Sequence, residues 1–219
     1  MILNLGVHRT GTVYVQRTLK PVRPHGHYFA DSTMRGWAGN ALKELPPEYR
    51  SDYKIGFVRN PFDLLVSWWE LMRRPDVMVQ HPGRRLGRLP FGEYLRTVAA
   101  RDESWPQKFP LHAQLFDQQW NVAVDYLGRY ETLDADLKRI AEITGATYTP
   151  LEPINSSNRR PWQEYYTEEL YELVEETWFM DLSFFGYDRD GVTDALTTFG
   201  QNPAPTGDRS RHVRDVEFD

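Results

Sequence analysis

The sequence contains no cysteine, and this absence removes several classes of protein at once. A disulfide scaffold, a zinc site built on thiolates and a cysteine nucleophile are all excluded. Long apolar runs are missing too, since no stretch approaches the roughly 18 apolar residues of a membrane-spanning helix. The chain also begins directly on a core-type apolar segment, with no visible signal peptide. We therefore predict no stable membrane insertion and, by default, a cytoplasmic location.

Excess positive charge is also missing. The 26 Lys and Arg residues stand against 31 Asp and Glu residues, which leaves a net charge of −5. An acidic protein is not expected to bind nucleic acid through a general electrostatic attraction, so any anion site must be local. The 219 residues are enough for one well-packed core. We predict a single domain over residues 1–196 and a poorly structured tail over residues 197–219, where apolar anchors are few.

The first twenty residues predict a strand, a loop and a helix. Apolar residues precede Gly6, a small polar loop covers residues 6–12, and Val15 and Leu19 then follow on a helical spacing. Such a loop directs backbone N–H groups, threonine hydroxyls and the positive end of a helix dipole toward one place, which suits a phosphate or a sulfate. Arg9 adds a full positive charge. An ordinary tight turn with a solvated arginine has the same pattern.

The loop is not a Walker A sequence. That pattern ends in Gly-Lys followed by Ser or Thr, and residues 6–12 contain no lysine. The missing lysine and hydroxyl neighbour argue against a magnesium-dependent kinase or NTPase.

A second anion site is predicted further along the chain. Residues 53–58 form a short apolar run typical of a buried strand, and Arg59 follows directly. Pro61 suits the first turn of a helix, in which Ser67 lies about two turns along. Because ligands of open α/β sheets gather at the carboxyl ends of strands, Arg59 and Ser67 are expected to reach an anion. The helix has one expected apolar face, made by Leu64, Leu65, Trp68, Leu71 and Met72.

The remaining segments alternate between strand and helix patterns. The five arginines within residues 73–88 stand against one aspartate and indicate an exposed loop, either a solvated excursion or a rim that attracts an acidic acceptor. Alternating strands and helices predict an α/β fold with a mostly parallel sheet. The other expected elements are strands at 27–30 and 122–127, a weak helix at 34–45, and helices at 91–101, from 133 to a cap at Gly145, and at 167–179.

Four segments in order carry a resemblance to a known family. Residues 6–12 resemble the 5′-phosphosulfate loop of sulfotransferases that use 3′-phosphoadenosine 5′-phosphosulfate (PAPS), in which a lysine usually stands at the position of Arg9. Residues 58–61 with Ser67 resemble the 3′-phosphate motif of that family. Residues 128–133 resemble the strand end and helix start that follow, and residues 165–188 resemble the closing helix and turn of its carbohydrate-type and small bacterial branches.

The resemblance implies a fold, a donor and a set of binding residues. The fold is a P-loop NTPase-like three-layer sandwich, the sulfotransferase fold. The donor is PAPS, the product is 3′-phosphoadenosine 5′-phosphate (PAP), and no metal takes part. The implied contacts are Arg9, Thr10, Gly11, Thr12 and Val13 for the phosphosulfate, Arg59 and Ser67 for the 3′-phosphate, Tyr130 near the adenine, and Arg159, with Arg160 as a second candidate, in a loop that returns to the cofactor.

The implied reaction is in-line transfer of a sulfuryl group to a hydroxyl or an amine. A fixed cation beside the leaving phosphate lowers the barrier, and Arg9 is the candidate. A guanidinium is a poor proton donor, so acid catalysis is in doubt. A histidine or glutamate usually serves the family as base. Related short bacterial sequences often carry a histidine where residues 35–37 stand here, so His27 is the best remaining candidate, with Asp31 and His112 behind it.

Partners and alternatives complete the predictions. The acceptor is expected to be a small molecule or a carbohydrate, including a glycolipid, and the oligomeric state is not predicted. Two alternatives remain open at this point: a P-loop-type nucleotide kinase, and a catalytically impaired protein that binds PAPS or PAP.

Overall fold

The computed structural model describes residues 1–7, 9–23, 47–74, 85–101, 111–116, 123–152 and 159–193. The chain groups into two compact units, each made of separate segments. The first combines Met1–Val58, Leu111–Ile154 and Thr197–Asp219, and the second combines Arg59–Pro110 and Asn155–Leu196. We describe each unit by itself, and the single domain over residues 1–196 stays a prediction.

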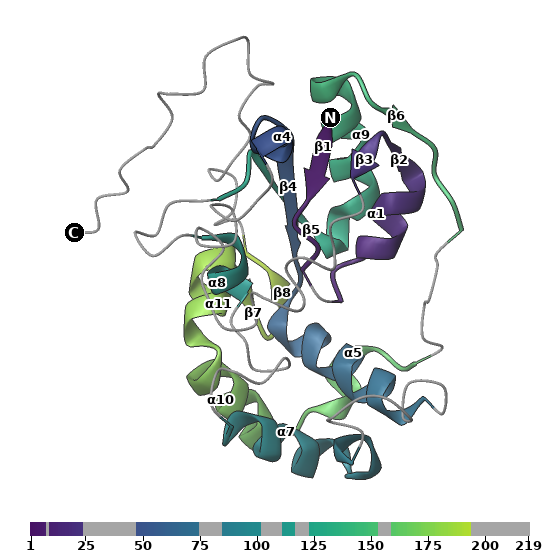
Figure 1. Cartoon of the computed structure of the whole chain (residues 1–219). Coiled ribbons are helices and arrows are strands. Elements are labelled where there is room, and N and C mark those ends of the chain that lie inside the picture. The colour runs from purple at the N-terminus through teal and green to yellow at the C-terminus, as the bar shows by residue number, and fades with distance from the viewer. Residues whose placement is uncertain are drawn as a thin grey trace, which may run out of the picture. The chain divides into compact units, whose positions relative to one another are not determined.

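The first unit is built on a parallel sheet (Figure 1). Its order is β3-β1-β4-β5, formed by Val22–Arg23, Ile2–Asn4, Tyr53–Val58 and Tyr126–Arg129. The register pairs Ile2 with Val22 on one side and with Tyr53 on the other, and Ile55 with Tyr126. All of these pairs are parallel, which confirms the predicted α/β class with a mostly parallel sheet.

Helices cover both faces of this sheet. On one face, α1 (Thr12–Thr18) and α9 (Leu133–Thr144) close a core with alternate residues of the strands. On the other face lies α8 (Leu111–Leu115), so close that a Cβ atom on Gly56 would stand 2.4 Å from Leu115 Cδ2. The core residues of the first face are Ile2, Val15, Leu19, Tyr53, Ile55, Phe57, Tyr126, Leu133, Leu137 and Ile140. The helix–sheet–helix arrangement agrees with the predicted three-layer fold.

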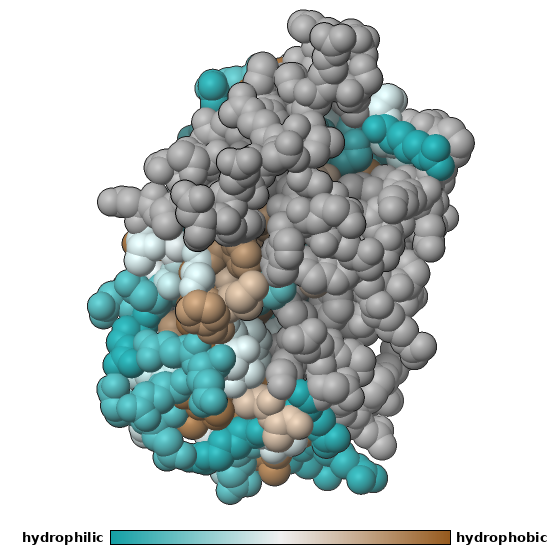
Figure 2. Space-filling view, turned by 90° about the vertical axis from the view of Figure 1, so that its left-hand side faces the viewer, coloured by the Kyte–Doolittle hydropathy of each residue, from teal (hydrophilic) through white to brown (hydrophobic). Residues whose placement is uncertain are grey.

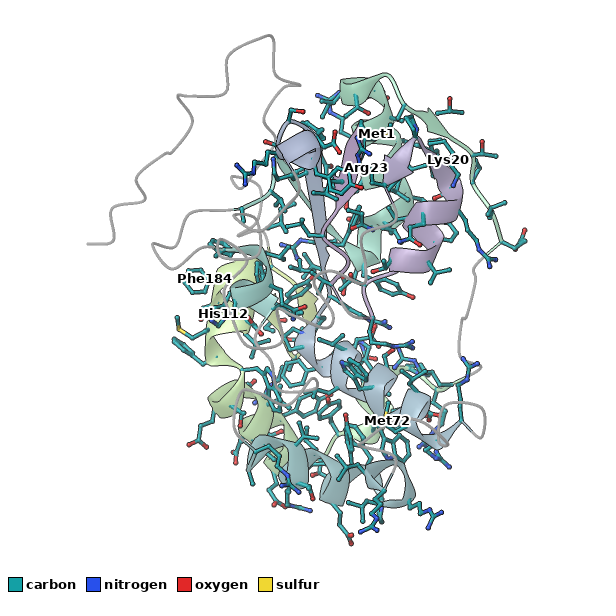
Figure 3. The ribbon with its side chains drawn as sticks, in the orientation of Figure 1. Met1, Lys20, Arg23, Met72, His112 and Phe184 are labelled. Carbon is teal, nitrogen blue, oxygen red and sulfur yellow. The ribbon has the colours of Figure 1, made fainter. Side chains whose placement is uncertain are left out.

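Smaller elements complete the first unit. The chain leaves α1 into β2 (Leu19–Lys20), which pairs antiparallel with β6 (Thr147–Tyr148). Gly145 ends α9 with a left-handed φ of 69°, as predicted from its position. The helix α4 (Pro47–Arg50) precedes β4, and the short helix η2 (Tyr130–Thr132) leads into α9. Met1 and Arg23 lie at the same end of the sheet (Figure 3), where Arg23 Nε donates to Asp52 Oδ2 at 2.5 Å.

One expected strand differs from the structure. The predicted strand at 27–30 and the predicted helix at 34–45 lie outside the described residues, and the edge strand β3 lies at Val22–Arg23. The strand expected at 122–127 begins only at Tyr126. The reason is Asp125, whose side chain accepts a hydrogen bond from Lys54 N at 2.7 Å and whose own N–H donates to Lys54 O at 2.8 Å. This bend delays the regular ladder until the next residue.

The second unit is mainly helical. Its elements are α5 (Pro61–Arg73), η1 (Leu86–Arg88), α7 (Phe91–Ala99), η3 (Trp162–Tyr165), α10 (Glu168–Thr177), α11 (Phe179–Phe185) and a hairpin of β7 (Tyr187–Asp188) and β8 (Gly191–Val192). Helices α7 and α10 lie side by side, joined by Arg96 Nη2, which donates to Glu169 Oε1 at 2.9 Å (Figure 1). The hairpin is tied to the start of α5 by Asn60 Nδ2, which donates to Asp188 O at 3.1 Å.

Helix α5 is buried on nearly all sides, not on one face as predicted. Every residue from Pro61 to Trp69 is buried, whereas Leu71 is only partly so. The cause is an aromatic cluster around it. Phe62 stacks on Trp162 at 5.5 Å between ring centroids and meets the edges of Tyr166 and Tyr171, both at 5.3 Å. Offset and edge-on pairs of this kind are the favourable aromatic geometries, so this cluster stabilises the start of the helix.

Two further expectations for the second unit were wrong in part. Residues 75–84 of the predicted exposed loop at 73–88 lie outside the described residues. Leu86 and Gly87 of the same segment are buried, and a Cβ atom on Gly87 would stand 2.3 Å from Met72 O. The helix expected at 167–179 ends at Thr177, and α11 begins after Trp178. Trp178 leaves the helical conformation, with φ −110° and ψ 25°, and its indole is buried.

The surface of the second unit exposes some apolar side chains. Phe179 is 60% exposed, and Met180 and Val192 are also exposed. Figure 2 shows apolar patches interrupted by hydrophilic residues on one face of the molecule. Within the described residues, no helix has the length and hydropathy needed to cross a bilayer.

The hairpin is also held to α10 by Arg189. Its guanidinium donates to both carboxylate oxygens of Glu175, at 2.8 and 2.7 Å, and to Glu168 at 2.6 Å. Hydrogen bonding from Arg189 lowers the pKa of Glu175 below its ordinary 4.5, against the opposing effect of burial. The stabilisation is therefore present above pH 4.5 and is lost as the pH falls through the lowered pKa of the folded state.

We predict that Glu175→Gln lowers the Tm at pH 7 by a few degrees at most, because the pair is partly exposed. The difference from wild type should shrink as the pH falls below 4.5, the ordinary glutamate pKa. Thermal unfolding followed by circular dichroism at several pH values measures this. Glu176→Gln, at the exposed neighbouring residue, is the matched control. A difference between Glu175→Gln and wild type that stays constant at low pH would contradict the assignment.

Candidate functional site

The loop between β1 and α1 lies at a topological switch point of the sheet. After β1, the next strand of this sheet, β3, lies on one side of β1, and the strand after that, β4, lies on the other side, so the strand order reverses here. Crevices outside the carboxyl ends of strands at such points are where open α/β sheets bind ligands. The loop predicted from residues 6–12 therefore occupies a binding position.

The backbone of this loop is strongly curved. Gly6, Arg9 and Gly11 have left-handed φ values of 58°, 63° and 84°. Asn4 Oδ1 accepts a hydrogen bond from Gly6 N at 3.1 Å and so fixes the exit from β1. A left-handed conformation is unfavourable for a residue with a side chain, so Arg9 is held there by its surroundings.

The two threonine hydroxyls brace the loop from within. Thr10 Oγ1 donates to Val7 O at 2.8 Å, and Thr12 Oγ1 donates to the same carbonyl at 3.1 Å. A hydroxyl has one hydrogen, so either threonine must give up its bond to Val7 before it can donate to an anion. In the arrangement observed, the groups suited to an anion are the backbone amides of the loop and the partly exposed Arg9.

Helix α1 starts at this loop without a side-chain cap. Gly11 is the N-cap residue and has no side chain to accept from the first turn. The first amides of a helix have no intrahelical acceptor, so they are the groups that an anion at a helix start receives. Val13, in this first turn, is 44% exposed.

Tyr130 packs beside the loop. A Cβ atom on Gly11 would stand 2.7 Å from Leu133 Cδ2 and 3.6 Å from two ring atoms of Tyr130. Only glycine fits this close approach at a positive φ. Tyr130 therefore supports the loop and also packs partly buried against the core of the first unit, next to the residues predicted to take the phosphosulfate.

The second predicted site lies in the second unit, at the start of α5. Strand β4 ends at Val58, and Arg59 is the next residue. Asn60 caps the helix by accepting from Phe62 N at 2.9 Å, and Pro61 occupies the first turn. This capped start fixes the backbone from which the Arg59 side chain extends.

The Arg59 guanidinium is buried and held by two side chains of α5. Its Nε donates to Asp63 Oδ2 at 2.8 Å, and its Nη2 lies 2.7 Å from the same oxygen. Its Nη1 donates to Ser67 Oγ at 3.3 Å. Arg59 and Ser67, which the eight-residue spacing predicted to act together, are thus in contact.

Arg159 joins the same cluster from a distant part of the chain. Its Nη2 donates to Asp63 Oδ1, so one carboxylate binds two guanidinium groups. Its Nη1 is buried with no acceptor among the residues that the structure describes. Among the described residues, the cluster contains two guanidinium groups and one carboxylate. The buried Nη1 of Arg159 is costly to leave without an acceptor, and an anion could supply the missing oxygen. This geometry suits a phosphate or sulfate group.

Sequence reasoning missed Asp63. Its signal was present, because an acidic residue in the first turn of a helix is favourable and Asp63 lies only four residues after Arg59. Arg160 does not join the cluster. Its side chain is 65% exposed, 3.4 Å from Glu164, and lies over the Tyr165 ring.

The candidate bases are only partly described. His27 and Asp31 lie outside the described residues. His112 lies on α8 in the first unit (Figure 3), where its side chain is buried. Among the residues that the structure describes, no group of three or more His, Asp or Glu side chains is arranged to hold a metal ion.

A comparison with protein families matches residues 27–188 to the sulfotransferase family. The chain belongs to the sulfotransferase family. The matched range includes Arg59, Ser67, Tyr130 and Arg159, and it begins after the loop at 6–12. Comparisons with curated proteins and with solved structures give no match. Family membership makes this sulfotransferase an enzyme that moves a sulfuryl group to an acceptor.

The close approach at Gly11 gives a stability prediction for this sulfotransferase. Gly11→Ala should lose roughly 1–2 kcal/mol of the free energy of unfolding to the left-handed backbone and about 1–3 kcal/mol more to the clash with Leu133. Gly145→Ala is the matched control, because Gly145 also has a positive φ but no atom within 4 Å of a Cβ. Urea denaturation measures the free energy of unfolding of both variants. Equal losses would show that Leu133 moves aside at no cost.

Proposed function

We propose that this sulfotransferase uses PAPS as its donor and releases PAP. The observation that carries the proposal is the buried cluster of Arg59, Ser67 and Arg159 around Asp63. A phosphate carries about −1.5 to −2 charges near neutral pH, with oxygens that match paired guanidinium groups. The two guanidinium groups that share Asp63, and the buried Nη1 of Arg159 that has no acceptor among the described residues, favour such a dianion, which we assign as the 3′-phosphate.

The loop at residues 9–13 is the proposed site of the 5′-phosphosulfate. Support comes from its switch-point position, its curved backbone and the uncapped start of α1. During transfer, the bond between sulfur and the bridging oxygen breaks, and negative charge builds on that oxygen. Arg9 is the cation proposed to stabilise this charge, and the backbone amides of the first turn would add their dipoles. Tyr130, beside Gly11, is the proposed neighbour of the adenine.

The acceptor is proposed to be a hydroxyl or amine of a small molecule or a carbohydrate. An alcohol must lose its proton as the new bond to sulfur forms, and His27 is the proposed base. The sequence of the loop disfavours the kinase alternative, because it lacks the phosphate-binding lysine.

The 3′-phosphate assignment predicts that Arg59→Ala weakens PAP binding by roughly 2–4 kcal/mol, the scale for removing one partner of a buried charge pair. Isothermal titration calorimetry with PAP measures the loss. Arg96→Ala removes an exposed arginine from the same unit and is the control, expected to bind PAP as wild type does. Equal affinity of Arg59→Ala and wild type would remove Arg59 from the site.

The same titration separates the donor classes. Wild-type protein should bind PAP without metal and should not bind ATP with magnesium. Binding of ATP with magnesium and not of PAP would overturn the proposal in favour of a kinase. Binding of PAPS with no transfer to any of a panel of hydroxyl and amine acceptors would favour a nucleotide-binding protein that lacks turnover.

His27 gives a prediction that concerns turnover alone. His27→Ala should lower the rate of transfer from PAPS by about 100-fold or more, the scale of general base catalysis, because the acceptor keeps its proton. PAP affinity, measured by calorimetry, should stay at the wild-type value. His212→Ala, in the tail predicted over residues 197–219, serves as the histidine control. Unchanged turnover in His27→Ala would exclude it as the base.

A further inference from the structure

We propose that Asp63 is a positioning residue that presents Arg59 and Arg159 together and thereby gives the site its preference for nucleotides with a 3′-phosphate. The inference rests on the proposed function and adds to it a residue that contacts no ligand itself. Its basis is that the two oxygens of the Asp63 carboxylate accept hydrogen bonds from two different arginines.

Each Asp63 oxygen holds a different arginine. Oδ2 accepts from Arg59, at 2.8 Å from Nε and 2.7 Å from Nη2, and Oδ1 accepts from Arg159 Nη2. The two arginines are 100 positions apart in the sequence, so no local geometry brings them together. The carboxylate is the shared partner that keeps two like charges side by side.

The carboxylate is itself rigidly placed. Asp63 lies in the first turn of α5, where a negative charge suits the helix dipole. Its backbone is fixed by the Asn60 cap, and the preceding residue, Phe62, is packed among Trp162, Tyr166 and Tyr171. Tyr166 Oη also donates to Phe62 O at 2.8 Å. The Asp63 side chain is only 13% exposed, so water competes little for its oxygens.

This placement orders the site before a ligand arrives. An arginine side chain has many rotamers, and its ordering opposes binding unless it is ordered in advance. Asp63 holds the Nε side of Arg59, while Ser67 receives Nη1. Asp63 also accepts from Arg159 Nη2. The buried Nη1 of Arg159 has no acceptor among the described residues. An incoming phosphate would therefore meet donors that are already oriented.

If only the net charge of the cluster mattered, loss of the Asp63 carboxylate would be expected to strengthen phosphate binding. Removal of the Asp63 charge would raise the net positive charge of the cluster, and a purely electrostatic account then predicts tighter binding of a phosphate. If Asp63 acts by position, its removal separates the two guanidinium groups and weakens binding. The two accounts differ in sign, so a binding measurement distinguishes them.

The test compares PAP with adenosine 5′-monophosphate (AMP), which lacks only the 3′-phosphate. Affinities for both are measured by calorimetry for wild type, Asp63→Asn and Asp63→Glu. Asparagine keeps the shape but turns an amide N–H₂ toward one arginine, and glutamate keeps the charge but moves it by one methylene. Glu175→Gln is the control, because it also removes a carboxylate bound by an arginine, in the same unit.

We expect both Asp63 variants to bind PAP about tenfold or more weaker, while AMP affinity stays within about twofold. Glu175→Gln should keep the wild-type preference. Tighter PAP binding by Asp63→Asn, an unchanged preference in both variants, or an equal loss for PAP and AMP would each overturn the inference. Asp63→Glu keeps an ion pair within reach and provides the measurement if the asparagine variant does not fold. A wild type without any preference for PAP over AMP would instead overturn the proposed function.

Discussion

The buried Arg59–Asp63–Arg159 triad is the interaction on which the second unit's site depends. Buried charges are tolerated when they are paired and hydrogen-bonded, and here one carboxylate serves two cations. The triad would be unstable on a loosely packed helix. Its setting is the capped, aromatic-lined start of α5, and the Asn60 cap also holds the closing hairpin through Asp188. Packing, capping and electrostatics at this point therefore act on the same few residues.

The two candidate anion sites use different physical means. The loop after β1 relies on backbone curvature, with left-handed residues and an uncapped helix start, and its threonine hydroxyls stabilise that curvature through the Val7 carbonyl. The cluster on α5 relies on side-chain charge held in place by other side chains. A backbone site accepts any small anion of suitable shape, whereas a guanidinium pair adds selectivity for a dianion with several oxygens.

Much of this was visible in the sequence, and the exceptions have physical causes. Period-2 and period-3.6 patterns predicted the parallel sheet and α9, and the Gly145 cap followed from backbone preference. The sequence placed Arg59 at the end of a strand and Ser67 about two turns into the next helix, both within reach of one anion, and the structure adds the hydrogen bond between them. Patterns could not show that Asp125 delays β5, that Trp178 divides one helix into two, or that aromatic residues from three segments enclose α5. Each of these depends on contacts between residues far apart in the chain. The threonine hydroxyls show a different limit: their acceptor, Val7 O, is close in the sequence, but the contact depends on the curved backbone of the loop, which the sequence pattern does not give.

The substitution of arginine at position 9, where the related motif has lysine, is compatible with the proposed chemistry. A lysine can give a proton to the leaving group, which an arginine does not do at neutral pH. In the proposed reaction the leaving group is a phosphate, whose second pKa is about 6, so it is stable as an anion at pH 7 without a proton. What the transition state needs is a fixed positive charge beside the bridging oxygen. The left-handed backbone of Arg9, at a φ of 63°, sets the direction in which that side chain leaves the loop.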